Sequence, residues 1–152
     1  HGKEYQVPVI ELTFRPSVYG IIIRDGTILL SRQWDGYDFP GGGVHKGETI
    51  EAALVREVKE ETGCEVKVGA IVAAENSFFK MPTDGAFVQS ILLYYMCEVV
   101  GGAISTALFS EYEKQYAKPA EWVDVKTVRA LKFYNSADSY ALIEKAEEIM
   151  KH

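Results

Sequence analysis

Short apolar runs separated by turn-forming residues fill the first two thirds of the chain. The runs that predict β-strands cover residues 18–23, 27–31, 65–74 and 87–100. The first two are separated by Arg24-Asp25-Gly26, and Asp-Gly between such runs is typical of a β-hairpin. The run 87–100 is rich in Ile, Leu and Tyr, which favours a central position in a sheet. Residues 75–86 contain Pro and Gly and predict a loop.

Two segments have the 3.6-residue periodicity of helices. Residues 49–62 begin with Thr49, a suitable N-cap, and stop before Gly63, a residue that favours the C-terminal cap. A second helix is predicted over residues 137–150, opened by Ser136. Its expected inward face consists of Tyr140, Ile143, Ala146 and Met150.

The C-terminal third adds one further strand. Residues 121–125 predict a short strand that leads into a helical turn near Leu131, whereas residues 111–119 are polar and aromatic and match neither pattern. Strands interleaved with two helices indicate an α/β or α+β sandwich. A length of 152 residues is that of one domain, so residues 1–152 are expected to share a single core.

Charge and composition narrow the classes of function. The chain has 16 basic and 22 acidic residues and a net charge of −6, which disfavours binding to nucleic acid or to an anionic membrane. No apolar run approaches the ~18–20 residues of a membrane span. Two cysteines, Cys64 and Cys97, make no disulfide framework and are expected to be buried thiols. A cytoplasmic location follows as an expectation.

The predicted helix 49–62 departs from its own apolar pattern. Ile50, Ala53 and Leu54 predict an inward stripe, but the next positions on that stripe are Glu57 and Glu61. Glu60 adds a third acid on the same face. Each like-charge pair costs roughly 0.2–0.5 kcal/mol, and an acid in the last turn opposes the helix dipole by about 0.3–1 kcal/mol. Local stability therefore does not account for this arrangement.

Two interpretations of the acidic face stay open at this point. In the first it is solvated, with Arg56 paired to Glu60 and Lys59 screening the charges. In the second it binds a cation together with the glycine-rich segment 39–48, whose backbone can approach a ligand without interference from Cβ atoms. Carboxylates beside exposed carbonyls form an all-oxygen site, which suits Mg²⁺ or Mn²⁺.

The segment from Gly42 to Cys64 resembles the complete Nudix box. The pattern G-x5-E-x7-R-E-U-x-E-E-x-G-U, with U an aliphatic residue, is met at every fixed position except the last, where Cys64 stands for an aliphatic residue. Many spaced constraints make this match specific. The flanking Phe39-Pro40-Gly41 and Glu121-Trp122-Val123 also look like Nudix features.

This resemblance implies a Nudix-type α/β/α sandwich with a mixed β-sheet between helices. It also implies Mg²⁺-dependent hydrolysis, with Mn²⁺ as an alternative, of a pyrophosphate linkage in a nucleoside diphosphate derivative. The product would be a nucleoside monophosphate and a second phosphorylated group. The residues to which the resemblance assigns metal binding are Glu57, Glu60 and Glu61, with the Gly41 carbonyl as a further ligand. Arg56 would orient Glu57, Glu48 would brace the loop, and Gly42 and Gly63 would have structural roles.

Substrate binding and proton transfer are less constrained by the resemblance. Arg32 is a candidate phosphate ligand at a strand end. The aromatic candidates for stacking on a base are Trp34, Tyr37, Phe78 and Phe79. Glu111 and Glu113 are candidate late acids, and together with Glu57 they are candidates for the general base.

The residues that distinguish the substrate subgroups of the family are absent from their expected positions downstream of Gly42–Cys64. A nucleoside triphosphate or related nucleotide is the favoured substrate. An ADP-ribose or sugar-nucleotide pyrophosphatase, and a catalytically silent nucleotide-sensing module, are the alternatives. A cation-binding helical protein would leave the glycine segment unexplained. A homodimer is compatible with the family.

Overall fold

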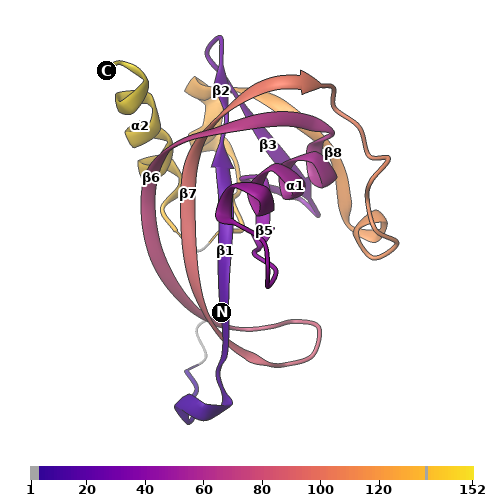
Figure 1. Cartoon of the computed structure of the whole chain (residues 1–152), viewed down its shortest axis with the longest axis vertical. Coiled ribbons are helices and arrows are strands. Elements are labelled where there is room, and N and C mark those ends of the chain that lie inside the picture. The colour runs from indigo at the N-terminus through magenta and orange to yellow at the C-terminus, as the bar shows by residue number, and fades with distance from the viewer. Residues whose placement is uncertain (1–3, 136) are drawn as a thin grey trace.

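The computed structural model describes residues 4–135 and 137–152, and its first sheet is mixed (Figure 1). The strands of this sheet lie in the order β5-β1-β7-β6. Their bounds are Thr13–Ile21 for β1, Gly41–Gly43 for β5, Cys64–Lys80 for β6 and Phe87–Gly102 for β7. β1 runs parallel to β7, whereas the β1–β5 and β6–β7 pairs are antiparallel. β7 therefore lies inside the sheet, as its apolar composition predicted.

A second, antiparallel sheet is built around β3. Its strands are β2 (Ile23–Arg24), β3 (Thr27–Gln33), β4 (Gly36–Asp38) and β8 (Ala117–Asp124). The predicted turn of the hairpin is confirmed, because Arg24 pairs with Thr27 across Asp25 and Gly26, which have φ values of 52° and 75°. Positive φ at both central residues matches the twist of the flanking strands. The predicted single strand 18–23 is wrong, because β1 ends at Ile21 in the first sheet and only β2 forms the hairpin.

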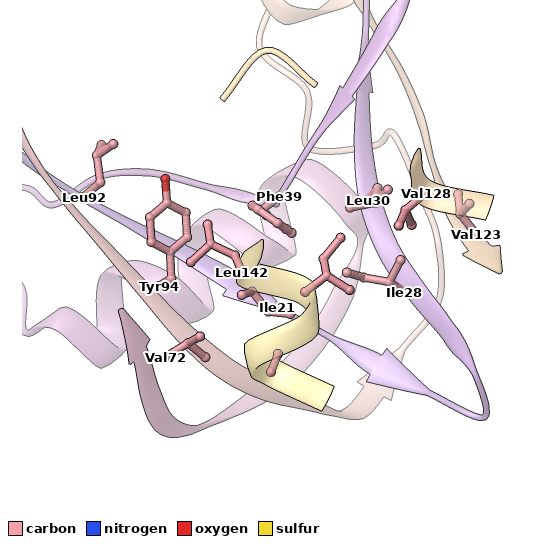
Figure 2. Close-up of a cluster of buried hydrophobic side chains, with 12 residues drawn as sticks. Ile21, Ile28, Leu30, Phe39, Val72, Leu92, Tyr94, Val123, Val128 and Leu142 are labelled. Carbon is pink, nitrogen blue, oxygen red and sulfur yellow. The ribbon is translucent and has the colours of Figure 1, made fainter. Parts of the chain in front are cut away.

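The two helices cover opposite faces of the β-structure. Tyr94 of β7 belongs to a buried cluster with residues of α2 (Ser139–Met150), and Figure 2 shows it near Leu142 and Phe39. Its neighbours Leu93 and Tyr95 pack against a second cluster, which includes Leu54 of α1 (Ile50–Thr62). Successive side chains of a strand point to opposite faces. The expected α/β/α sandwich with a mixed sheet is therefore confirmed.

Helix α1 has the predicted bounds but a different buried stripe. The Thr49 hydroxyl accepts a hydrogen bond from the Ala52 amide at 3.0 Å, and Gly63 ends the helix with φ of 85°. Ile50 was expected to face inward, yet it is 38% exposed. The buried positions are Ala53, Leu54, Val58 and Thr62. The stripe therefore starts at Ala53, so Ala53 and Leu54 are confirmed as inward-facing and Ile50 is not.

Helix α2 begins later than the sequence indicated. Its N-cap is Asp138, whose Oδ1 accepts a hydrogen bond from the Ala141 amide at 3.1 Å. The predicted opening residue Ser136 lies outside the described residues. Met150 was assigned to the inward face but is 52% exposed, since the last turn of α2 passes the edge of the core. Within the described residues no helix has the length and apolarity needed to cross a membrane.

The predicted loop 75–86 is wrong for its first half. β6 continues to Lys80, and residues 75–80 pair with residues 87–92 of β7. Backbone pairing across the sheet outweighs the polar character of Glu75, Asn76 and Ser77, so only residues 81–86 form the turn. β8 likewise begins at Ala117 rather than at residue 121.

Three 3₁₀ helices complete the fold: η1 (Val9–Glu11), η2 (Glu113–Gln115) and η3 (Val125–Ala130). η3 confirms the predicted helical turn before Leu131. Cys64 and Cys97 are free and buried, as expected.

Leu54→Ala should lower the free energy of unfolding by about 2–5 kcal/mol, because the fully buried side chain leaves a cavity under α1. Ile50→Ala on the same helix is the matched control, and it should cost less than about 1 kcal/mol, because that side chain is partly exposed. Urea unfolding followed by circular dichroism measures both values. Equal losses would mean that the helix packs through its first turn after all.

Candidate active site

The guanidinium of Arg56 joins the glycine segment to helix α1. It donates to both carboxylate oxygens of Glu48, from Nε at 2.7 Å and from Nη2 at 2.9 Å. Nη1 donates to Glu57 at 3.0 Å and to Glu60 at 3.3 Å. Nη2 also donates to the Gly43 carbonyl at 3.1 Å. A single cation therefore holds three acids and one backbone carbonyl.

Glu48 connects this cation to the loop that precedes α1. Besides accepting from Arg56, its carboxylate accepts a hydrogen bond from the His45 amide at 2.9 Å. The Arg56 guanidinium, followed by that amide, lowers the pKa of Glu48 to about 2. Glu48 is consequently ionised over the physiological pH range, and it ties residues 45–48 to the helix.

Glu61 has a different environment from Glu48, Glu57 and Glu60, which with it are called the box acids. Its Oε2 accepts a hydrogen bond from the Gly41 amide at 2.9 Å, and no basic side chain of the described chain forms a salt bridge with it. Burial raises the pKa of Glu61 well above its usual value, and the charges of Glu57, Asp38 and Glu113 raise it further. The carboxylate is thus partly buried and has no salt-bridge partner within the described residues. Burial also raises the pKa of Glu57, although Arg56 opposes the shift.

The glycines of this segment are required by close approaches. A Cβ atom on Gly42 would lie 2.8 Å from the carboxylate of Glu57, and one on Gly41 would lie 2.1 Å from the Val18 carbonyl oxygen. At the other end of α1, a Cβ on Gly63 would lie 2.3 Å from the Ala103 carbonyl oxygen. Larger residues at these positions would separate the loop from the acids.

The described residues contain no group of three His, Cys, Asp or Glu side chains gathered closely enough to hold a metal ion. Glu57 and Glu60 are turned toward Arg56, and Glu61 toward Gly41. The ion pair of the solvated interpretation, Arg56 with Glu60, is therefore present, but Lys59 contacts Glu65 instead of screening the box acids. The donor set nevertheless suits a hard cation, because Glu61 offers a partly buried carboxylate that has no salt bridge to a cationic side chain in the described residues.

A small pocket opens beside Glu61. Arg32 of β3 and Lys118 of β8 line it and are directly opposite each other, next to a bulge in the β3–β8 pairing. The Arg32 guanidinium contacts Glu121 at 3.4 Å, while its Nε is buried and has no hydrogen-bond partner among the described residues. The remaining lining residues are Ser31, Gln33, Phe109, Glu113, Tyr116 and Ala117. Two cations and two acids therefore share one pocket.

The structure separates the two candidate late acids. Glu113, on the segment between β7 and β8 at the right of Figure 1, lines the pocket with Glu61. The Glu111 side chain is 90% exposed and pairs with Lys114 at 2.9 Å. Only one of the two is brought to the box acids.

Phe78 and Phe79 are not brought to this pocket. They lie near the end of β6, beside the β6–β7 turn at the bottom of Figure 1, and Phe78 is 63% exposed. Neither residue lines the pocket that contains Arg32 and Glu61.

Three residues near the site were missed in the sequence. Asp38 directly precedes Phe39-Pro40-Gly41, and burial raises its pKa to about 7. Its place next to the glycine segment was a usable signal. Lys118 and Tyr116 reach the pocket through pairing and packing with β3, and no local pattern indicated them. A separate open hollow of about 580 Å³ is lined by Glu75, Asn76, Ser77, Leu92, Ala137 and Asp138.

Comparison with known sequences places this geometry in context. The family model described as NUDIX domain matches residues 13–145. An ADP-ribose pyrophosphatase of Methanocaldococcus jannaschii is 31% identical over 147 residues, covering 87% of this chain and 80% of that protein. An RNA pyrophosphohydrolase of Aeromonas hydrophila is 41% identical over 71 residues, covering 44% of this chain and 40% of that protein.

Solved structures show the same fold at lower identity. An ADP-ribose pyrophosphatase from Streptococcus suis superposes with a TM-score of 0.69 at 19% identity, covering 91% of this chain and 92% of that one. A NUDIX hydrolase from Nitrosomonas europaea has a TM-score of 0.69 at 18% identity, covering 92% of each chain.

In the metal-free protein, Glu61→Gln should raise the melting temperature at pH 7 by about 1–6 °C, because it removes a partly buried carboxylate that neighbouring acids repel. Burial raises the folded-state pKa of Glu61, so its contribution to stability is present at low pH and is lost as the pH rises through that pKa. The gain in melting temperature of Glu61→Gln over wild type should therefore vanish at about pH 4 and grow as the pH rises to 7. Melting curves in EDTA across this range measure it.

Glu60→Gln is the matched comparison, since Glu60 is already paired with Arg56. It should leave the melting temperature unchanged or lower it. A Glu61→Gln variant that melts below wild type in EDTA at pH 7 would show that the carboxylate is stabilised by contacts rather than repelled.

Proposed function

The chain belongs to the Nudix family of hydrolases, and we propose that it hydrolyses the pyrophosphate linkage of a nucleotide with Mg²⁺ held at Glu57, Glu60 and Glu61. The products would be a nucleoside monophosphate and a second phosphorylated group. The observation that carries the proposal is Glu61, a partly buried carboxylate set against the Gly41 backbone, with no salt bridge to a cationic side chain among the described residues. A divalent cation would neutralise this carboxylate.

The metal would be held by oxygen donors only, with the Gly41 carbonyl beside the three glutamates. Mg²⁺ fits this set, and Mn²⁺ is an alternative. Bound there, the ion would polarise the phosphoryl oxygens and neutralise charge on the leaving phosphate. Glu60, whose side chain is 40% exposed, would exchange its contact with Arg56 for the ion. Arg56 would keep Glu57 and Glu48 in place.

The pocket beside the box supplies the remaining groups. Arg32 and Lys118 would bind substrate phosphate, and the unpartnered Nε of Arg32 is a donor available for it. The attacking water forms its bond to phosphorus and loses a proton, while the bond to the leaving phosphate breaks. We assign that proton to Glu113, because it lines the pocket and forms no salt bridge within the described residues, whereas Glu57 is bound by Arg56.

Two substrate classes are proposed in parallel. A nucleoside triphosphate agrees with the sequence features, and the relative from M. jannaschii favours ADP-ribose as the second candidate. A sensing module without turnover is disfavoured, because all acids of the box are present. Phe78 and Phe79 stay candidates only for a substrate that extends to the β6–β7 turn. A homodimer and a cytoplasmic location, the latter resting on two free thiols, remain part of the proposal.

Mg²⁺ should raise the melting temperature of the wild-type protein, since binding at 100 times Kd stabilises the folded state by about 2.7 kcal/mol. Glu61→Gln should lose most of this gain. The difference in melting temperature between this variant and wild type that is expected in EDTA should therefore become smaller or change sign in Mg²⁺. Glu51→Gln, an exposed acid in the first turn of the same helix, should gain as much as wild type. If all three proteins gain equally, the metal binds elsewhere.

Glu113→Gln should lower kcat about 100-fold or more and remove the acidic limb of the pH–rate profile, as expected for loss of a general base. Glu111→Gln is the matched control and should behave as wild type. The assay is chromatographic separation of products from nucleoside triphosphates, ADP-ribose, sugar nucleotides and dinucleoside polyphosphates, each with Mg²⁺ and with EDTA. No metal-dependent turnover of any of them would reject the hydrolase proposal.

A further inference from the structure

A row of aromatic side chains leads away from the pocket. Trp34, at the turn between β3 and β4, stacks on Tyr116 with ring centroids 4.8 Å apart. Tyr134 packs edge-on against Trp34 at 5.4 Å, and Tyr112 against Tyr116 at 5.2 Å. Trp34 is nevertheless 51% exposed. The row therefore presents the indole ring to solvent rather than burying it in the core.

The backbone of Trp34 is held in an unfavourable conformation. Its φ is 48°, in the left-handed region that glycine or asparagine normally occupies. Its amide donates to the Tyr116 carbonyl at 2.9 Å, and the next residue, Asp35, bonds to Tyr134 and pairs with Lys132. Strained residues fixed by their surroundings concentrate at ligand-binding sites. A bulky, exposed aromatic residue in a strained conformation is therefore a candidate ligand-binding residue.

Tyr116 connects this row to the chemistry. It lines the pocket together with Arg32, Lys118 and Glu61. Burial raises the pKa of the Tyr116 hydroxyl, with added contributions from Glu113, Glu61 and Glu57. The indole of Trp34 thus lies one stacked ring beyond the two cations proposed to bind phosphate. A nucleotide whose phosphate contacts Arg32 would have its nucleoside within reach of Trp34.

We infer that Trp34, supported by Tyr116, is a stacking site for a nucleobase of the substrate. The inference rests on the proposed function, since it needs a nucleotide whose phosphates occupy the pocket. Stacking tolerates every base, because each presents a π-face. The base could be that of a mononucleotide or the second base of a dinucleotide, and the chemistry recognised is the same. Trp34 is then a binding residue and takes no part in proton transfer.

Fluorescence measures this directly without turnover. The chain has two tryptophans. The other, Trp122, lies on β8, against the Arg24 guanidinium, and pairs with Leu29 of β3. In a Trp122→Phe background Trp34 is the sole indole. Its emission should be quenched by AMP with Mg²⁺, and by ADP-ribose and diadenosine tetraphosphate in EDTA. Ribose 5-phosphate and pyrophosphate, which lack a base, should leave it unchanged. Quenching by the dinucleotide alone would assign the site to the second base.

Steady-state kinetics provide the second readout. Trp34→Gly removes the ring and relieves the left-handed strain, so it should fold, and its KM should rise roughly 5- to 100-fold with little change in kcat. Trp34→Phe keeps a ring and should lose less. Trp122→Phe should match wild type.

The inference is overturned if no base-bearing ligand quenches Trp34 and folded Trp34→Gly retains the wild-type KM. That result would move the base to another surface, such as the hollow beside Asn76. A chain that hydrolyses none of the nucleotides, yet shows base-dependent quenching, would reject the hydrolase proposal and leave the stacking site intact.

Discussion

The geometry of the site depends on the fork of hydrogen-bond donors of Arg56. Three carboxylates within one loop and one helix repel each other, and only a cation with several donors in fixed directions can hold them simultaneously. Arg56 does this while also reaching the Gly43 carbonyl, so the glycine segment and α1 form one rigid unit. A lysine, with a compact charge and no planar fork, would contact one acid at a time.

The second constraint is the acid that Arg56 does not reach. Glu61 is partly buried, accepts a hydrogen bond from the Gly41 amide and lies near other carboxylates. Folding alone gains nothing from an ionised group in this place. The helix therefore combines two kinds of acid: Glu57 and Glu60, which pair with Arg56, and Glu61, to which we assign the proposed cation. Such opposition between local stability and chemistry is typical of functional sites.

Features set by local sequence could be predicted, and features set by distant contacts could not. The extent of α1, its caps and the glycine segment follow from residues within one or two turns of each other. The exposure of Ile50 depends on where the sheet ends, and the extension of β6 to Lys80 depends on pairing with β7. Lys118 enters the pocket only through its register with Arg32. The segment Gly42–Cys64 could therefore be predicted from the sequence, whereas the pairing of Arg32 with Lys118 in the pocket could not.

The register of β3 and β8 has a consequence for the sheet itself. Arg32 faces Lys118 directly across the two strands, beyond a bulge that interrupts regular pairing after Leu30. Like charges in directly opposed positions weaken a strand pair. An anion held between the two side chains would replace that repulsion with attraction to both. Binding of an anion in the pocket would therefore also strengthen the pairing of β3 with β8 at this end of the sheet.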